Sequence, residues 1–253
     1  MLTMKKNKIE EIRINKFIAS AGEYSRRKAD ELILEGKVKV NGEKITEPGI
    51  MVTIKDEVTV NGKRIRPKGE MKCAVFYKPA GYITTKSDDR GRKTIYDILP
   101  QELHYMNPAG RLDRATTGLL ILTNDGELLQ KLTHPKIKIR KIYTATVEGK
   151  VTQDDFDKMQ KGIEIEKGKI AHAEGCLLEY KDKQSTVELT LYQGYNRQIR
   201  RMMKTLGHPV MSLKRIAHAN ITLDGLEKGQ FKYLKTKQIV ELNNYIKKCQ
   251  NAK

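Results

Sequence analysis

Residues 108–126 read PAGRLDRATTGLLILTNDG and carry the clearest structural signal in the chain. The apolar run from Leu119 to Leu122 predicts a strand buried on both faces. Asp113 precedes this run between two arginines, so it lies in a loop that feeds directly into the core and can be held rigidly there. Asn124-Asp125-Gly126 then predicts a turn that tolerates positive φ. The alternative for Asp113 is a solvated loop whose charges neutralise one another.

The charge balance predicts a polyanionic partner. The 253 residues include 49 Lys and Arg against 31 Asp and Glu, a formal net charge of +18, and the excess is spread along the chain. Nucleic acid and an anionic membrane surface both fit such a charge. We favour nucleic acid because no apolar stretch approaches the length of a membrane span, and no Lys-rich amphipathic segment carries aromatic residues on its other face.

The N-terminal sequence and the cysteines indicate a reducing, cytoplasmic environment. The N-terminal residues MLTMKKNKIEEIR lack the apolar region of a signal peptide. The three cysteines, Cys73, Cys176 and Cys249, are far apart and form no C-x-x-C motif, so they predict neither a disulfide framework nor a zinc site. The five histidines are scattered, and we expect no metal.

The first part of the chain predicts a small separate module. Apolar residues at helical spacing between Ile14 and Ala21 predict one helix, and Ser25 caps a second one that ends at Gly36. Two short alternating strands follow, residues 37–40 and 58–60, and each ends in an Asn-Gly pair that favours a hairpin.

Three cations, Arg26, Arg27 and Lys28, occupy the first turn of the second predicted helix. Cations at this end oppose the helix dipole, so they do not help the helix to form. They would help a phosphate to dock on the open N–H groups there. From the residues alone, a phosphate site and a solvated basic face fit equally well.

Residues 65–70 are short, charged and contain Pro and Gly, which predicts a linker. Strands and helices alternate from Met71 onward, and the last ten residues look frayed. The polar, basic segment 84–93 fits either a mobile loop that lies on RNA or an ordinary surface loop. The predicted elements are strands at 73–77, 141–148, 163–166, 175–180 and 186–192, and helices at 127–132, 152–161 and 196–206.

The helix predicted for Asn196–Leu206 has two contrasting faces. One stripe is apolar, and the other carries Arg197, Arg200, Arg201 and Lys204. A basic outer stripe is usually solvated. This one brings guanidinium groups to a core edge, which suits pairing with a carboxylate or a phosphate.

The polar residues as a whole offer one well-placed carboxylate, several arginines and a tyrosine. The sequence has neither of the common nucleotide-binding glycine loops, and no Cys-His or Ser-His-Asp arrangement can be localised. Cofactor-free chemistry by one Asp on a nucleic-acid base is therefore the natural interpretation.

Several ordered motifs resemble a known family. GRLDRATTGLLILTNDG, Tyr77–Gly81, Lys141–Tyr143 and Gly194–Met202 closely resemble the signatures of pseudouridine synthases of the RsuA/RluB type. The resemblance implies that Asp113 is the catalytic residue, acting either by attack at C1′ or by removal of the C2′ proton. It also implies that the Arg200 guanidinium donates two parallel hydrogen bonds to the Asp113 carboxylate, and that Tyr143 stacks on the uracil. An ordinary core tyrosine is the alternative for Tyr143.

By the same resemblance, the first module is an αL-type RNA-binding domain. The target uridine has to leave its stack, and Arg111 is the candidate to fill the vacated space or to hold a flanking phosphate. Lys78 and Pro79 would shape the pocket floor. The RNA-contact candidates are Arg26, Arg27, Lys28, Arg111, Arg197 and Arg201.

The implied architecture is α+β, with an RNA-binding domain at residues 9–66 and a catalytic domain at residues 71–245. The catalytic domain is expected to have a mixed, mainly antiparallel sheet flanked by helices. The implied activity is uridine-to-pseudouridine isomerisation in ribosomal RNA by a monomer without metal or cofactor. The segment Arg197–Met202 resembles the RluB/RluF branch, which favours large-subunit rRNA. The alternatives are small-subunit rRNA, or a catalytically silent ribosome-assembly protein.

Overall fold

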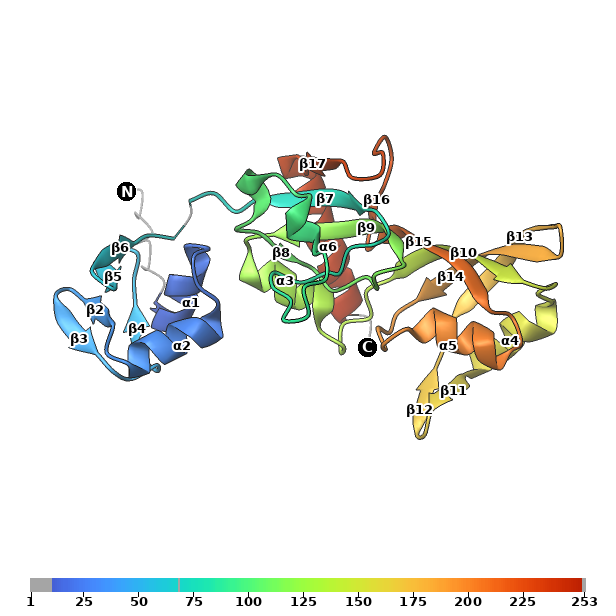
Figure 1. Ribbon diagram of the computed structural model, residues 1–253, viewed down its shortest axis with the longest axis horizontal. Coiled ribbons are helices and arrows are strands. Elements are labelled where there is room, and N and C mark those ends of the chain that lie inside the picture. The colour runs from blue at the N-terminus through green and yellow to red at the C-terminus, as the bar shows by residue number, and fades with distance from the viewer. Residues whose placement is uncertain (1–10, 68, 252–253) are drawn as a thin grey trace, which may run out of the picture. The chain divides into compact units, whose positions relative to one another are not determined.

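The computed structural model describes residues 11–67 and 69–251. They divide into two compact units, which we call the N-terminal unit (residues up to Glu70, with Glu102–Met106) and the C-terminal unit (the rest of the chain). Figure 1 shows the elements of each unit. Residues 9 and 10, which begin the predicted first domain, and residue 68 of the predicted linker lie outside the described residues.

The N-terminal unit packs two helices on a small antiparallel sheet. Its four-stranded sheet has the order β3-β2-β5-β6, and β1 pairs with β4. Its apolar core is made of residues from both helices and the sheet, among them Phe17, Ile33 and Val60. The elements are β1 (Ile12–Arg13), α1 (Ile14–Ser20), α2 (Arg26–Leu34), β2 (Val38–Val40), β3 (Glu43–Ile45), β4 (Met51–Val52), β5 (Val58–Val60) and β6 (Lys63–Ile65).

The local signals of this unit are confirmed. Ser25 caps α2, because its side chain accepts a hydrogen bond from the Lys28 backbone N–H at 3.1 Å. Both Asn-Gly pairs form tight hairpins with positive φ at each residue: Asn41 has 52° and Gly42 has 89°, as a type I′ turn requires. The predicted linker starts one residue too early, since Ile65 is 2% exposed and belongs to β6.

The C-terminal unit is built on one large sheet. Nine strands of the described chain follow the order β13-β14-β10-β15-β9-β7-β17, with β16 beside β15 and β8 beside β9. Strands β15 and β9 run parallel, whereas the other neighbouring pairs of this sheet, as far as the described residues go, are antiparallel. The predicted mixed, mainly antiparallel sheet is therefore confirmed.

Helices cover this sheet over two apolar clusters. Helices α4 and α5 pack with β10, β14 and β15, and helices α3 and α6 pack with β7 and β9. The elements from β7 onward are β7 (Cys73–Lys78), η1 (Ile95–Asp97), η2 (Gln101–Leu103, whose last two residues belong to the N-terminal unit), β8 (Asn107–Pro108), β9 (Thr117–Thr123), α3 (Gly126–Thr133), β10 (Lys141–Glu148), α4 (Gln153–Lys161), β11 (Ile163–Glu166), β12 (Lys169–Ala171), β13 (Glu174–Lys181), β14 (Gln184–Leu191), α5 (Gln198–Thr205), β15 (Val210–His218), β16 (Ile221–Thr222), β17 (Phe231–Tyr233) and α6 (Thr236–Asn251).

The strand predicted at Leu119 is β9, and it begins two residues earlier, at Thr117. Gly118 explains the difference. Its φ is +112°, and a Cβ at this position would lie 2.2 Å from the Arg215 carbonyl oxygen. Only glycine lets β9 approach β15 this closely, and this contact sets the sheet register directly after Asp113.

Three local predictions are wrong. Asn124-Asp125-Gly126 is not a positive-φ turn: Asp125 caps α3, accepting from the N–H groups of Glu127 and Leu128 at 2.8 and 3.1 Å. Helix α5 begins at Gln198, because Arg197 adopts left-handed geometry. The C-terminal residues up to Asn251 are not frayed, since α6 reaches that residue and buries Ile246 to 1% exposure against the core.

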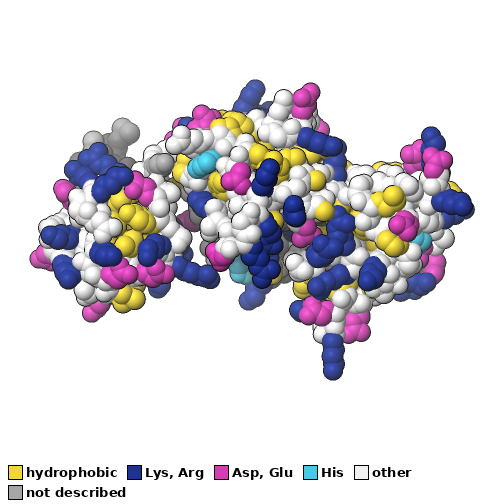
Figure 2. Space-filling view, viewed as in Figure 1, with side chains coloured by type: hydrophobic (Ala, Val, Ile, Leu, Met, Phe, Trp, Pro, Cys, Tyr) yellow, Lys and Arg dark blue, Asp and Glu magenta, His cyan; other side chains and the backbone are white. Residues whose placement is uncertain are grey.

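No helix in the described part of the chain is long and apolar enough to cross a membrane. Figure 2 shows Lys and Arg side chains distributed over both units on the face in view. This matches the spread of positive charge along the sequence.

Candidate active site

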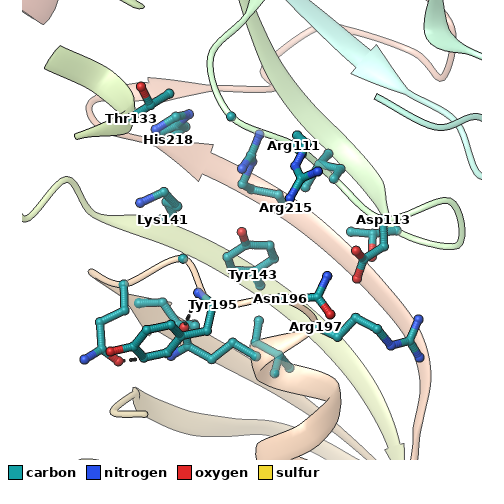
Figure 3. Close-up of a pocket in the computed structure, with 18 of the residues that line it drawn as sticks. Arg111, Asp113, Thr133, Lys141, Tyr143, Tyr195, Asn196, Arg197, Arg215 and His218 are labelled. Atoms are coloured by element: carbon teal, nitrogen blue, oxygen red, sulfur yellow. Dashed lines mark hydrogen bonds between the residues drawn. The ribbon is translucent and has the colours of Figure 1, made fainter. Parts of the chain in front are cut away.

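The C-terminal unit contains a pocket of about 1130 Å³ that opens between the loop before β9, strands β10 and β15, and the start of α5. All three predicted catalytic residues line it: Asp113, Tyr143 and Arg200. Two predicted RNA contacts, Arg111 and Arg197, line it as well. Figure 3 shows Asp113 and Tyr143 projecting into this space from different strands and loops.

Lys78, at the end of β7, fixes the loop that carries Asp113. Its ammonium donates to the backbone carbonyls of Pro79, Asp113 and Thr116 at 2.9, 3.2 and 2.9 Å. The Thr116 N–H closes the loop by donating to the Asp113 carbonyl at 3.0 Å. The loop is therefore held by its main chain, which leaves the Asp113 carboxylate free to face the pocket.

The position of Lys78 differs from the prediction that it shapes the pocket floor. Its side chain is fully buried behind the loop, and neither Lys78 nor Pro79 is among the pocket's lining residues. Burial lowers the pKa of Lys78 to about 8, although the nearby Asp113 carboxylate opposes the shift. Lys78 is thus a positioning residue.

Two further contacts hold the same loop from the other side. The Thr84 hydroxyl donates to the Leu112 carbonyl at 3.0 Å, and the Leu112 N–H donates back to that hydroxyl at 3.2 Å. The Gly81 N–H donates to the Arg114 carbonyl at 2.8 Å, and the Arg114 Nε donates to the Gly81 carbonyl at 3.2 Å. The motif Tyr77–Gly81 therefore acts by clamping the Asp113 loop.

The basic segment 84–93 contains an ion pair between two of its own side chains. Arg92 and Asp88 form an ion pair at 2.6 Å, which lowers the pKa of Asp88 to about 2. Thr84, Asp88 and Arg92 also line the pocket. This segment thus forms one wall of the pocket.

The predicted fork between Arg200 and Asp113 does not form among the described residues. The Arg200 Nη1 instead donates to the Val210 carbonyl at 3.0 Å, and the buried Nε has no hydrogen-bond partner. Burial and the charge of Arg197 lower the pKa of Arg200, and the Asp113 carboxylate opposes the shift. The two groups interact electrostatically, and Arg200 keeps one donor unused.

The other residues predicted to contact RNA differ in whether their side chains are already paired within the protein. Arg201 pairs with Glu166 of β11 at 3.1 Å and is not among the lining residues of the pocket. On α2, Lys28 pairs with Glu31 at 2.8 Å, and the Arg26 Nη2 donates to Asn15 at 3.3 Å. Arg27 is exposed, and no ion pair or hydrogen bond of its side chain occurs among the described residues.

The sequence did not single out three basic residues of this pocket. Lys141, Arg215 and His218 lie on the neighbouring strands β10 and β15 and line the pocket with Tyr143. Lys141 was visible only as part of a motif, and His218 only as one of several scattered histidines. Their proximity depends on the strand register, which no local sequence signal specifies.

Within the described residues, no group of three His, Cys, Asp or Glu side chains could hold a metal ion. The pocket offers the Asp113 carboxylate on a rigid loop, the Tyr143 ring and several cations. These are the groups needed to hold a nucleobase and its phosphates while a carboxylate acts on the sugar. The fold and the site together define an RNA-modifying enzyme.

Comparison with known proteins makes the class specific. Residues 72–205 match the RNA pseudouridylate synthase family, and residues 12–58 match the S4 domain. The chain belongs to the RNA pseudouridylate synthase family. It has the RsuA/RluB-type order, in which an S4 domain precedes the synthase domain, so the predicted family, fold class and enzyme activity are confirmed.

Individual relatives match nearly the whole chain. It is 44% identical over 245 residues to the Bacillus subtilis (strain 168) protein named ribosomal large subunit pseudouridine synthase B, covering 95% of this chain and 99% of that one. An Aquifex aeolicus (strain VF5) protein named as an uncharacterized RNA pseudouridine synthase is 42% identical, covering 92% and 94%. A crystal structure of a pseudouridylate synthase is similar with a TM-score of 0.65 and 29% identity, covering 91% of this chain and 99% of its own.

Proposed function

We propose that this protein isomerises a specific uridine of large-subunit ribosomal RNA through Asp113. The observation that carries the proposal is the Asp113 loop: buried Lys78 and Thr84 clamp its main chain at the wall of a pocket that Tyr143 and Arg200 also line. A reacting carboxylate needs this kind of fixed placement, because a displacement of about 1 Å can lower a rate by about 100-fold.

We assign separate roles to three other residues of the pocket. Tyr143 stacks on the uracil of the flipped nucleotide. Arg200 pairs with Asp113 when substrate excludes water from the pocket, because the two groups already attract each other electrostatically. Arg111 is exposed at the pocket rim, where it fills the space that the uridine vacates or holds a flanking phosphate.

Residues 9–66 act as the RNA-binding domain, and residues 71–245 carry the chemistry. Arg26, Arg27 and Lys28 supply phosphate contacts from the start of α2, with Arg197 and Arg201 contributing from the C-terminal unit. The choice of large-subunit rRNA rests on the name of the Bacillus subtilis relative and on the sequence of residues 197–202. The protein works as a monomer in the cytoplasm, without metal or cofactor.

The experiment is carbodiimide-based pseudouridine mapping of all rRNA from cells with and without this protein. We expect one large-subunit uridine to lose its modification, and we expect the wild-type gene, but not an Asp113→Asn variant, to restore it. A lost modification in small-subunit rRNA would reassign the substrate. If no site changed, and purified protein bound rRNA without forming pseudouridine, the protein would be a silent assembly factor.

A further inference from the structure

A bulge in β15 turns a second group of basic side chains toward the pocket. Lys141 lies opposite His218, and Tyr143 lies opposite Arg215, with a register shift between Ile142 and Tyr143. Side chains alternate along a regular strand, so residues three apart normally face opposite sides. The extra residue, Ile216, brings Arg215 and His218 to the same face as Lys141 and Tyr143.

The three basic groups have no carboxylate among them. The Arg215 Nε donates to the Leu119 carbonyl at 2.7 Å, while its Nη2 is buried without a partner. The His218 ring is also buried; neither nitrogen makes a hydrogen bond of good geometry, although the Leu132 backbone carbonyl lies close enough to favour the protonated ring slightly. The Lys141 ammonium donates to the Ile139 carbonyl at 3.1 Å. No ion pair of Lys141 or Arg215 occurs among the described residues, so these two cations give this wall a positive potential.

Lys141 is the member of this group that a ligand can reach. Arg215 and His218 are 2% and 1% exposed, and their unpartnered atoms are closed off by packing. Lys141 is only half-buried and lines the pocket. Arg215 therefore supplies the buried positive charge, because burial and the neighbouring cations Arg215 and Lys141 hold the pKa of His218 well below its usual value and leave the ring neutral. The Lys141 ammonium, with donor capacity left, is the contacting group.

The order of residues along the sheet says which part of the substrate would meet Lys141. Strand β15 pairs at His218 with Lys141, at Arg215 with Tyr143, and at Lys214 with Thr117, close to the Asp113 loop. Tyr143 thus separates Lys141 from Asp113, as Figure 3 also shows. Lys141 and Tyr143 are same-face neighbours on β10, and such residues lie about 7 Å apart. When the ribose of a uridine lies at Asp113 and its ring lies on Tyr143, the ring edge farthest from the ribose therefore points toward Lys141.

We propose that the Lys141 ammonium holds the uracil ring and stabilises the negative charge that the ring acquires when it detaches from the sugar. The inference rests on the proposed function of the same pocket. When the C1′–N1 bond breaks, its electron pair stays on N1 and spreads onto O2 and O4. Asp113 meanwhile either bonds to C1′ or takes the C2′ proton. C5 then bonds to C1′ as Asp113 leaves C1′ or returns the proton to C2′, the C5 proton leaves to water, and N1 takes up a proton. Lys141 donates hydrogen bonds to a carbonyl oxygen throughout, and its effect is greatest when the ring is an anion.

Protonation of Lys141 then limits the rate at high pH. Burial, followed by the charge of Arg215, lowers the pKa of Lys141 to about 8. His218 lies opposite it on β15, and Arg215 and Tyr143 lie next along the two strands. His134, Lys138 and Asp113 line the same pocket. The ammonium is charged at neutral pH and loses its proton as the pH rises through about 8.

The test compares Lys141→Met, Lys141→Arg and the control Lys136→Met, an exposed residue outside the pocket lining. Single-turnover rates are measured by tritium release from an rRNA fragment containing 5-tritiated uridine at saturating protein, and affinity by filter binding. Lys141→Met should lower the rate by about 100-fold, as for loss of one donor to a developing anion, with unchanged affinity. The wild-type rate should fall above pH 8, whereas Lys141→Arg should keep its rate to higher pH.

Three outcomes would overturn the inference. If Lys141→Met had the same single-turnover rate as the wild type, Lys141 would have no role in the reaction. Weaker binding and a smaller salt slope, at an unchanged saturated rate, would make Lys141 a phosphate contact. A Lys141→Arg rate that falls at the same pH as the wild type would assign that titration to another group. If instead the wild-type protein formed no pseudouridine, the proposed function would fail first, and Asp113→Asn run in parallel distinguishes the two failures.

Discussion

The role of Lys78 gives a prediction whose size follows from the structure. Lys78→Met keeps a similar length but removes the donor that the carbonyls of Pro79, Asp113 and Thr116 share. The Asp113 carbonyl keeps the Thr116 N–H, so the Pro79 and Thr116 carbonyls lose this partner outright. An unsatisfied buried acceptor costs about 1–3 kcal/mol, and removal of a buried ammonium returns several kcal/mol of desolvation. These effects largely offset, so we expect a net loss of about 2 kcal/mol in the free energy of unfolding. Turnover should fall by about 100-fold, because the carboxylate is displaced.

The same residue predicts a pH dependence of stability. The folded pKa of Lys78 is lowered from 10.5 to about 8. Between these values the unfolded chain holds a proton that the folded protein has released, so the stability of the wild type rises with pH across this window. At about 1.4 kcal/mol per pH unit, the gain is about 3 kcal/mol, and it should be missing from Lys78→Met.

Urea unfolding of the two proteins between pH 8 and 10.5 measures this difference, and tritium release from 5-tritiated uridine measures turnover. Lys161→Met, which removes an exposed lysine at the end of α4, controls for the loss of charge. The reasoning would be refuted by a Lys78→Met variant that turns over normally. A stability difference that stays constant with pH would also refute it.

The remaining predictions concern Asp113, Arg200 and the basic turn of α2. Asp113→Asn should pack normally and form no pseudouridine. It should bind its rRNA fragment at least as well as the wild type, because one negative charge near the phosphates is removed. Tritium release measures the activity and filter binding the affinity, and lost binding would make Asp113 structural. Arg200→Lys keeps the charge without the forked geometry, so turnover should fall while circular dichroism stays unchanged, and normal turnover would shift the role to Arg201. Arg27→Ala should reduce the salt slope of rRNA binding by about one. Lys28→Ala should reduce it less, because Lys28 is paired with Glu31. Equal slopes for both variants and the wild type would show that this turn is only solvated.

The sequence alone specified the elements whose signals are local. The cap at Ser25, the two Asn-Gly hairpins and the buried run of β9 depend on residues close together in the chain. Backbone preferences and short-range periodicity determine such features, so a single sequence is enough to predict them. Family resemblance then added the residues Asp113, Tyr143 and Arg200, which the structure brings to one pocket.

Other features needed contacts between distant segments. Arg200 donates to Val210 because α5 lies against β15. Lys78 stands behind the Asp113 loop because β7 pairs with β9 in a register that the turn residues do not set.

The sequence determined helices α1 to α5, the hairpins, the excess of positive charge and the motif around Asp113, because each is encoded within a few neighbouring residues. Tertiary structure alone decided the electrostatics of the pocket. The bulge at Ile216 puts Arg215 and His218 beside Lys141, and burial then lowers the pKa of Lys141. Strand register and desolvation arise only when segments far apart in the chain pack together, so they leave no local pattern in the sequence.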